Sequence, residues 1–163
     1  MGKATVWSNS DGLAVGFGTR SVTTSGAFGI SDNGSTQKLH CEFDWSDLDT
    51  SLSTTSDFIV YGPVIPNGAV ILKSTLKVTE AFTSGTDIDI GLYDKDGAAV
   101  DAAGLDAAVI TANLTLGAEI DGDGSDVNTV VATTGGVKVG VIRTGVFDAG
   151  QAVLEVEFKT PQS

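Results

Sequence analysis

Cysteine is almost absent from this sequence. Cys41 is the only cysteine among 163 residues, so an internal disulfide is excluded. The fold must therefore be held together by packing alone, which suits folding in a reducing cell interior. A chain of this length can bury enough apolar surface to do so in a single domain.

Long apolar runs are missing as well. No stretch approaches the roughly 18 apolar residues that a membrane helix requires. Residues 1–5 lead into polar residues and not into the apolar segment of an export signal. We therefore expect no membrane partner and no export, with synthesis in the cytoplasm of the producing cell.

Cations are few. Nine lysines and arginines stand against 21 aspartates and glutamates, which gives a net charge of −12. Phosphate binding needs clustered cations, and the cations of this chain are scattered, so we do not expect nucleic acid as a partner. The acidity fits a glycine-rich β protein that its charge keeps soluble.

Residues suited to catalysis are equally sparse. The only histidine, His40, stands beside Cys41 in a segment of alternating polarity. Neighbouring side chains on a strand point to opposite faces, which excludes a Cys-His dyad. The chain has no Gly-x-Ser-x-Gly elbow, and residues 16–20 lack the third glycine and the lysine of a phosphate-binding loop. We expect no catalytic residue, no cofactor and no small-molecule substrate.

One acidic segment raises the question of a metal ion. Asp121, Asp123 and Asp126 alternate with glycine and serine, and closely spaced carboxylates can surround calcium. A standard calcium loop needs glutamate at its twelfth position, which from Asp121 is Ala132. The sequence therefore favours an acidic turn with no metal site, and weak calcium binding stays open.

What the sequence does contain is alternation. Apolar and polar residues take turns along several segments, as in strands with one buried face. Residues 104–110 form the one plausible helix, although Gly104 weakens it. The pattern predicts an all-β, antiparallel two-sheet β-sandwich that is jelly-roll-like, with an extended N-terminal arm. The expected strands are residues 37–45, 58–61, 70–82, 87–93, 127–132, 137–141 and 152–158.

The strand expected over residues 70–82 has two distinct faces. Its even-numbered apolar residues, including Val70, Leu72 and Leu76, are expected to face the core. Lys73 and Lys77 then lie on the outer face. On an acidic body this small basic patch is a candidate contact with a partner or a sister subunit.

The first 35 residues differ from the rest. They are rich in glycine and serine and too polar to make a core alone. We expect residues 1–35 to form an arm, or a loosely paired hairpin, and residues 36–163 to form the sandwich body. Trp7, Phe17 and Phe28 are expected to dock on the body or on a neighbouring molecule.

Parts of the body resemble a known class of protein. The segment Ile65-Pro66-Asn67-Gly68-Ala69-Val70-Ile71, followed by Glu80-Ala81-Phe82 and by residues 89–97, resembles small structural proteins of tailed bacteriophages. Residues 136–139 and 150–156 share this resemblance. It covers roughly residues 60 to 160 and is one of pattern, without an invariant signature.

The resemblance implies a role in a virion. Such a protein would be a head decoration, or cement, protein on the capsid surface, made in the host cytoplasm. It would bind the major capsid protein, often as a homotrimer, and it offers no catalytic residue to carry over. Whether the protein belongs to head, neck or tail stays open.

A second interpretation comes from another class of function. A β-sandwich can also be a carbohydrate- or ligand-binding module of a phage fibre or of a secreted protein. The chain offers little material for a sugar-stacking surface, because its amphipathic rings are only Trp7, Trp45, Tyr61 and Tyr93.

Overall fold

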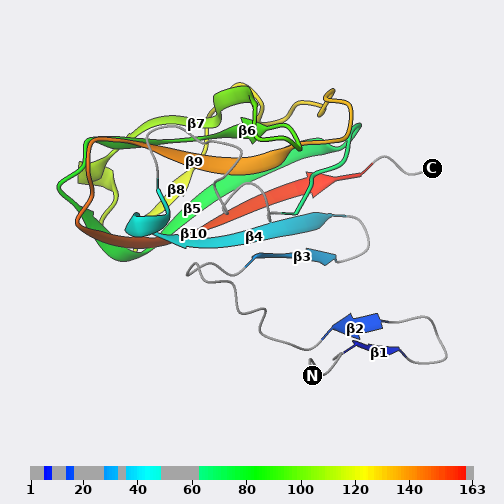
Figure 1. Cartoon of the computed structure of the whole chain (residues 1–163), viewed down its shortest axis with the longest axis horizontal. Coiled ribbons are helices and arrows are strands. Elements are labelled where there is room, and N and C mark those ends of the chain that lie inside the picture. Colours follow the sequence, from blue (N-terminus) through cyan, green and yellow to red (C-terminus); the bar gives the residue numbers. More distant parts are fainter. Residues whose placement is uncertain (1–5, 9–13, 17–27, 33–35, 49–62, 161–163) are drawn as a thin grey trace.

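The computed structural model describes residues 6–8, 14–16, 28–32, 36–48 and 63–160. Its strands form two larger antiparallel sheets and one small separate sheet (Figure 1). The five-stranded sheet has the order β3 (Phe28–Asp32), β4 (Gln37–Asp44), β10 (Ala149–Lys159), β5 (Val70–Thr83) and β8 (Glu119–Asp121). The three-stranded sheet has the order β7 (Ala99–Ile110), β6 (Asp87–Tyr93) and β9 (Lys138–Thr144). The small sheet pairs β1 (Val6–Ser8) with β2 (Ala14–Gly16).

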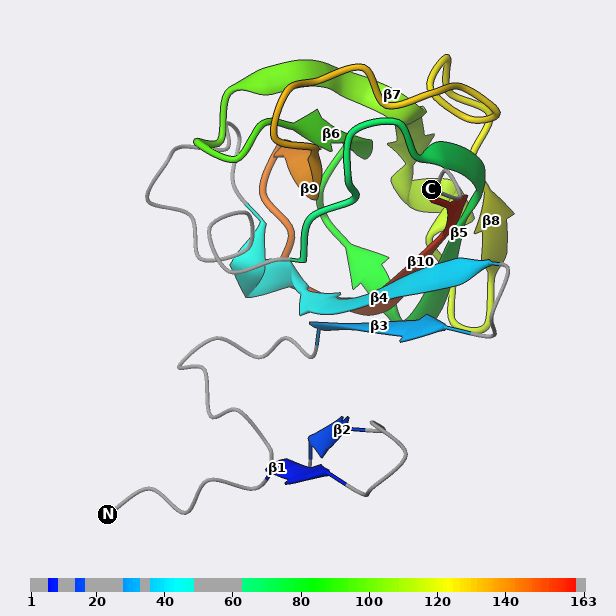
Figure 2. The same cartoon turned by 90° about the vertical axis from the view of Figure 1, so that its right-hand side faces the viewer.

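The two larger sheets face each other as the layers of a sandwich (Figure 2). This confirms the predicted all-β, antiparallel two-sheet architecture. The helical segments of the described residues are two 3-10 turns, η1 (Trp45–Asp47) and η2 (Thr111–Asn113). No helix in this part of the chain is long and apolar enough to cross a bilayer.

Alternation along the strands builds the core between the layers. Every second residue of β4 and β10 is buried, and β6 and β9 supply the facing side. Each large apolar side chain that is fully buried stabilises the fold by about 1.5–3 kcal/mol relative to an exposed position. The inward residues of these four strands include Leu39, Phe43, Ile88, Ile90, Val141, Leu154, Val156 and Phe158.

A cluster of three phenylalanines fills one part of this core. The ring of Phe82 lies 6.3 Å from that of Phe43 and 5.5 Å, edge to face, from that of Phe147. Two glycines make room for these rings. A Cβ atom on Gly85 would lie 2.4 Å from the Phe147 ring, and one on Gly150 would lie 2.3 Å from the Phe82 ring.

The predicted register of β5 is wrong at its beginning. Ile71 is fully buried, whereas Leu72, expected to face the core, is 37% exposed. The cause is an extra residue in β5: Glu157 of β10 pairs with Lys73, but the next residue, Phe158, pairs with Ile71. Such a β-bulge reverses which residues of the strand face inward. From Leu76 onward the predicted phase is correct, with Leu76 buried.

The predicted helix over residues 104–110 is also wrong, because this segment belongs to β7. Leu105 and Val109 are both buried, and their spacing of four imitates a helix face. Pairing with β6 overrides this local preference, since Asp106 lies opposite Ile90 and Val109 opposite Ile88. The pairing of β7 with β6 is irregular here. Apolar and polar residues therefore do not alternate strictly along this segment, and alternation did not predict a strand.

Two other expected strands have different outcomes. Residues 127–132 do not form a named strand, but their backbone follows the start of β5. Val130 bridges Val70, and the Val131 amide donates to the Ala69 carbonyl at 2.8 Å. The strand expected over residues 58–61 lies outside the described residues.

The N-terminal region contains a paired hairpin, as expected. β1 and β2 are antiparallel, with Trp7 opposite Val15, and neither pairs with a larger sheet. The later segment β3 is instead the edge strand of the five-stranded sheet, where it pairs with β4. The division into an arm over residues 1–35 and a body over residues 36–163 stays a prediction.

The β-bulge predicts that substitutions at two adjacent residues lower the free energy of unfolding by very different amounts. Ile71→Ala should lower the free energy of unfolding by about 2–5 kcal/mol, because it leaves a cavity in the core. Leu72→Ala should cost less than about 1 kcal/mol, because that side chain is partly in water. Urea denaturation of both variants measures the difference. Equal costs, or a greater cost at Leu72, would contradict this register.

Candidate functional site

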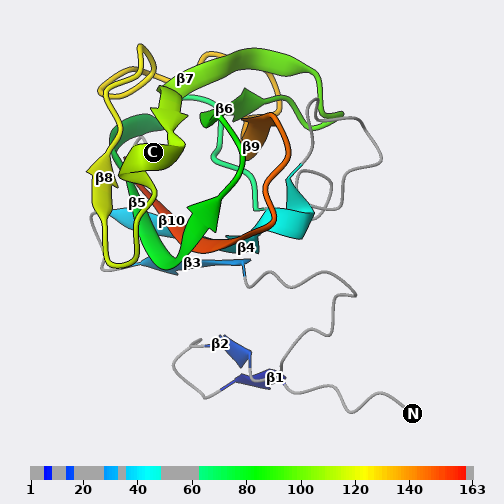
Figure 3. The same cartoon turned by 90° about the vertical axis from the view of Figure 1, so that its left-hand side faces the viewer.

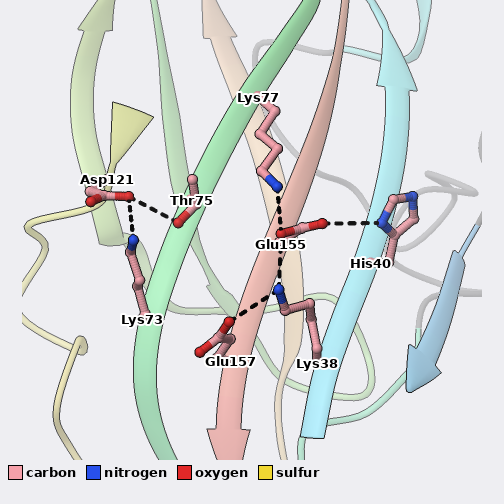
Figure 4. Close-up of polar contacts among 8 residues, drawn as sticks. All are labelled: Lys38, His40, Lys73, Thr75, Lys77, Asp121, Glu155 and Glu157. Atoms are coloured by element: carbon pink, nitrogen blue, oxygen red, sulfur yellow. Dashed lines mark hydrogen bonds and ion pairs between the residues drawn. The ribbon is translucent and has the colours of Figure 1, made fainter. Parts of the chain in front are cut away.

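The outer face of the five-stranded sheet carries a network of charged side chains (Figure 4). Alternation produces it, because the residues between the inward-facing ones point to the outer face of the sheet. β4, β10 and β5 lie next to one another, so their outward side chains meet across the strands. The network comprises Lys38, His40, Lys73, Thr75, Lys77, Asp121, Glu155 and Glu157.

Glu155 is the centre of this network. Its Oε2 accepts from Lys38 Nζ at 3.2 Å and from Lys77 Nζ at 3.0 Å, and its Oε1 lies 3.9 Å from His40 Nδ1. Burial acts to raise the pKa of the Glu155 carboxyl, but the hydrogen bonds from Lys77 and Lys38 outweigh it and the pKa is lowered. Glu155 is therefore held ionised between two lysines from two different strands.

Lys38 links the two glutamates of β10. Its Nζ lies 3.1 Å from Glu157 Oε1, in addition to its contact with Glu155. Hydrogen bonds to Glu157 and Glu155 raise the pKa of Lys38. The acidic pair on the outer face of β10 is thus compensated by cations of the neighbouring strands.

Lys73 belongs to a second group at the edge of the same sheet. Its Nζ lies 2.9 Å from Asp121 Oδ1, which also accepts from Thr75 Oγ1 at 3.0 Å. The hydrogen bond from Lys73, followed by that from Thr75, lowers the pKa of Asp121. This group connects β5 to the short edge strand β8.

The sequence-predicted contact residues can now be placed. Lys73 and Lys77 lie on the outer face, as expected, and each is paired with a carboxylate of its own sheet. The backbone of Trp7 lies in β1 and that of Phe28 in β3. Phe17 is outside the described residues. The role of these five residues in partner binding stays a prediction.

The only cysteine and histidine of the chain point away from each other. Cys41 is 2% exposed in the core, whereas the His40 side chain is 45% exposed on the outer face. Burial, followed by the charges of Asp47 and Glu42, raises the pKa of the Cys41 thiol well above its ordinary value. The geometry thus confirms that these two residues cannot act as a nucleophile and its base.

A separate acidic cluster lies between β7 and the segment after β8. The Ser125 hydroxyl donates to Asp101 Oδ2 at 3.1 Å. Asp106 is 7% exposed, and burial, with Asp123 and Asp89, raises its pKa to about 6. Burial, followed by the charge of Asp101, raises the pKa of Asp126. Ionisation of Asp106 and Asp126 is therefore unfavourable in the folded protein, whereas Glu155 is stabilised in its ionised form by Lys38 and Lys77.

The acidic cluster does not form a metal centre as it stands. Across the described residues, no group of three or more histidine, cysteine, aspartate or glutamate side chains is arranged to hold a metal ion. The open question of weak calcium binding near Asp121 therefore receives no support from geometry.

Sequence reasoning missed the most important members of both groups. Glu155 was not singled out, because its role depends on its pairing with β4 and β5, strands that lie far from β10 in the chain. Asp106 was hidden inside the segment expected to be helical. Two sequence signals pointed to parts of the acidic cluster: the acidic segment with Asp123 and Asp126, and Gly104, Gly122 and Gly124, which all stand at close contacts.

Comparisons with known proteins give little further information. No model of a known protein family matches the chain, and no curated protein does. Among solved structures, the chain is similar to one described as "Cyanophage Pam1 capsid asymmetric unit", with a TM-score of 0.46 and 16% sequence identity. The match covers 94% of this chain and 98% of that one. Values this low establish neither a shared fold nor a shared function.

The network around Glu155 predicts a stability effect that depends on pH. Glu155→Gln should lower the free energy of unfolding by about 1 kcal/mol near neutral pH, a modest value because the lysine partners are exposed. The lowered pKa means that this stabilisation is present above the unfolded-state pKa, near 4.5, and is lost as pH falls through the folded-state pKa. Urea denaturation near neutral pH and in acid measures the change.

The matched control for this prediction is Glu80→Gln. Glu80 is an exposed residue of the same sheet, and its replacement removes the same charge. A difference between Glu155→Gln and the native chain that stays constant into acid would contradict the prediction, and so would an equal effect of Glu80→Gln.

Proposed function

We propose that this chain is a non-enzymatic head decoration, or cement, protein of a tailed bacteriophage. It binds the lattice of the major capsid protein from outside, as a homotrimer, and stabilises the head. It is made in the host cytoplasm and then resides on the capsid surface. The proposal involves no nucleic acid, membrane, cofactor or small-molecule substrate.

The observation that carries the proposal is how the phage-like segments pair in the structure. Ile65 bridges Val137, which joins the first of these segments to one near the end of the chain. Glu80 pairs with Gln151, and Leu92 pairs with Val139. The resemblance is therefore carried by segments that contact one another in space and together make one structural unit.

The charged face supports the same proposal. The two acids of β10 that could have suggested paired catalytic carboxylates are bound to lysines. Cys41 is buried and His40 points away from it. In the residues that the structure describes, the polar groups of the outer face thus stabilise a sheet and do not form a reactive centre.

The alternative of a carbohydrate-binding module gains nothing from the structure. Tyr93, one of the few rings suited to stacking on a sugar, is only 3% exposed. Trp45 of η1 is 41% exposed. Of the amphipathic rings whose side chains the structure describes, it is the only accessible one.

The mechanism proposed for capsid binding uses the N-terminal arm. Trp7, Phe17 and Phe28 anchor the arm on neighbouring molecules, while the sandwich packs around a threefold axis. Two observations favour this arrangement: the β1–β2 hairpin pairs with neither larger sheet, and β3 stands at a sheet edge. An edge strand is a natural place for an added strand of a partner.

Deletion of the arm tests this mechanism. Removal of residues 1–27 leaves β3 in its sheet, so the body should unfold at the same denaturant concentration as the full chain. Occupancy on capsids made of the cognate major capsid protein should fall by at least about tenfold, the effect of losing one strong interface residue. Co-sedimentation with capsids measures occupancy. Unchanged occupancy would remove residues 1–27, with Trp7 and Phe17, from the mechanism.

Charge reversal tests the predicted basic contact. Lys73→Glu with Lys77→Glu should weaken capsid binding by about tenfold if these lysines face an acidic surface. Because both lysines pair with carboxylates, Lys38→Glu is the matched control: it disturbs the same network outside the predicted contact. Binding by co-sedimentation is compared with unfolding in urea. Native binding by the double variant would leave the two lysines with a structural role alone.

A further inference from the structure

One side of the sandwich is closed by the segment over residues 122–126. Its backbone bonds to both sheets: the Gly122 amide donates to the Ser74 carbonyl of β5 at 2.9 Å, and the Gly124 amide donates to the Leu105 carbonyl of β7 at 3.0 Å. The Asp126 amide donates to the Gly104 carbonyl at 2.8 Å. In Figure 3 this segment follows β8 on the side where β5 and β7 approach each other. We call it the seam segment.

Glycine makes the close approach of the seam segment possible. A Cβ atom on Gly122 would lie 2.3 Å from the Leu105 carbonyl oxygen, and one on Gly124 would lie 2.3 Å from that of Gly104. On the opposite strand, a Cβ atom on Gly104 would lie 2.2 Å from Asp126 Oδ2. The carboxylate of Asp126 is thus seated against the backbone of β7.

The seam segment and its surroundings carry mainly negative charge. Asp126 Oδ2 is buried and has no hydrogen-bond partner among the described residues. Asp106 of β7 is almost fully buried and feels the charge of Asp123 of the seam segment, while the amide of Ala107 acts in its favour. The titratable groups around the seam are Asp101 and Asp106 from β7, Asp123 and Asp126 from the segment itself, and Asp89 and Tyr93 from β6. The Lys73–Asp121 pair of the outer face stands directly before the segment.

These groups do not neutralise one another. The single lysine in this set is paired with Asp121, at 2.9 Å. The phenol of Tyr93 is neutral, because burial, with Asp89 and Asp101, raises its pKa to about 12. The unfavourable influences on Asp106 and Asp126 are burial and other carboxylates, and no cation among the described residues opposes them.

We propose that the seam segment is a proton-sensitive latch between the two sheets, which loosens when Asp106 and Asp126 ionise and tightens when they bind protons. Ionisation of Asp106 and Asp126 adds negative charge next to other carboxylates in a poorly hydrated seam. The resulting repulsion weakens the three backbone hydrogen bonds that close the seam. Protonation removes that repulsion and lowers the cost of burying the two carboxyl groups. The inference does not depend on a role in a capsid.

The sign of the pH effect follows from the direction of the pKa changes. The pKa of Asp106 rises from 3.8 to about 6 on folding. The folded, latched form therefore gains stability as pH falls from above 6 toward 4, and it gains nothing further below the unfolded-state pKa. The opposite dependence is expected of Glu155, so the two carboxylates can be told apart in one titration.

Amide hydrogen exchange of the full chain, in the presence of a chelator, tests the latch. After correction for intrinsic exchange, protection of the Gly124 and Asp126 amides should rise about tenfold between about pH 7.5 and about pH 5, the equivalent of one pKa unit. Protection of the Leu154 amide in the central strand β10 should rise less. Asp106→Asn and Asp126→Asn, made separately, should show high protection at both pH values. Glu80→Gln should behave as the native chain.

Several results would overturn the proposal. Protection of the two seam amides that is equal at both pH values would do so, and so would a rise that Leu154 shares in full. Asparagine variants that keep the native pH response would exclude Asp106 and Asp126 as the responsible groups. Protection that rises with about 5 mM calcium at pH near 7.5, but not with acid, would replace the latch by a cation site.

Discussion

Strand β10 pairs with β4 on one side and with β5 on the other, so the positions of both neighbours depend on its alternation of inward and outward residues. Its inward set, Ala152 to Phe158, is fully buried and fixes the core side of the larger sheet. Its outward set holds Glu155, which meets Lys38 of β4 and Lys77 of β5. A shift of one residue in this strand would expose the first set and bury the second. Core packing and surface charge therefore impose the same register.

The parts of the fold that could be predicted from sequence are those in which local and global constraints agree. β4 and β10 alternate without interruption, so their inward faces follow directly from residue order. The start of β5 could not be predicted, because the extra residue at Leu72 is imposed by pairing with Phe158, far along the chain. Residues 104–110 could not be assigned for a similar reason: their apolar spacing fits a helix, and the partner strand decides otherwise.

The candidate site follows the same division. Its residue types were visible in the sequence, and the outward direction of Lys73 and Lys77 was predicted. Their partners were not, because Asp121 and Glu155 are brought to them by strand order, which alternation does not reveal. The acidic seam was still less accessible. It depends on close backbone contacts between residues near 104 and residues near 124, and only glycine content hints at such contacts.

The buried thiol of Cys41 has a consequence for the conditions under which the fold can exist. It is the only cysteine of the chain, it is sealed in the core, and burial disfavours the thiolate that would react. No covalent bond of the fold is made by oxidation or broken by reduction. The protein can therefore pass from a reducing cell interior to oxidising surroundings without a change in its covalent structure. Its free energy of unfolding should not depend on whether the surroundings are reducing or oxidising.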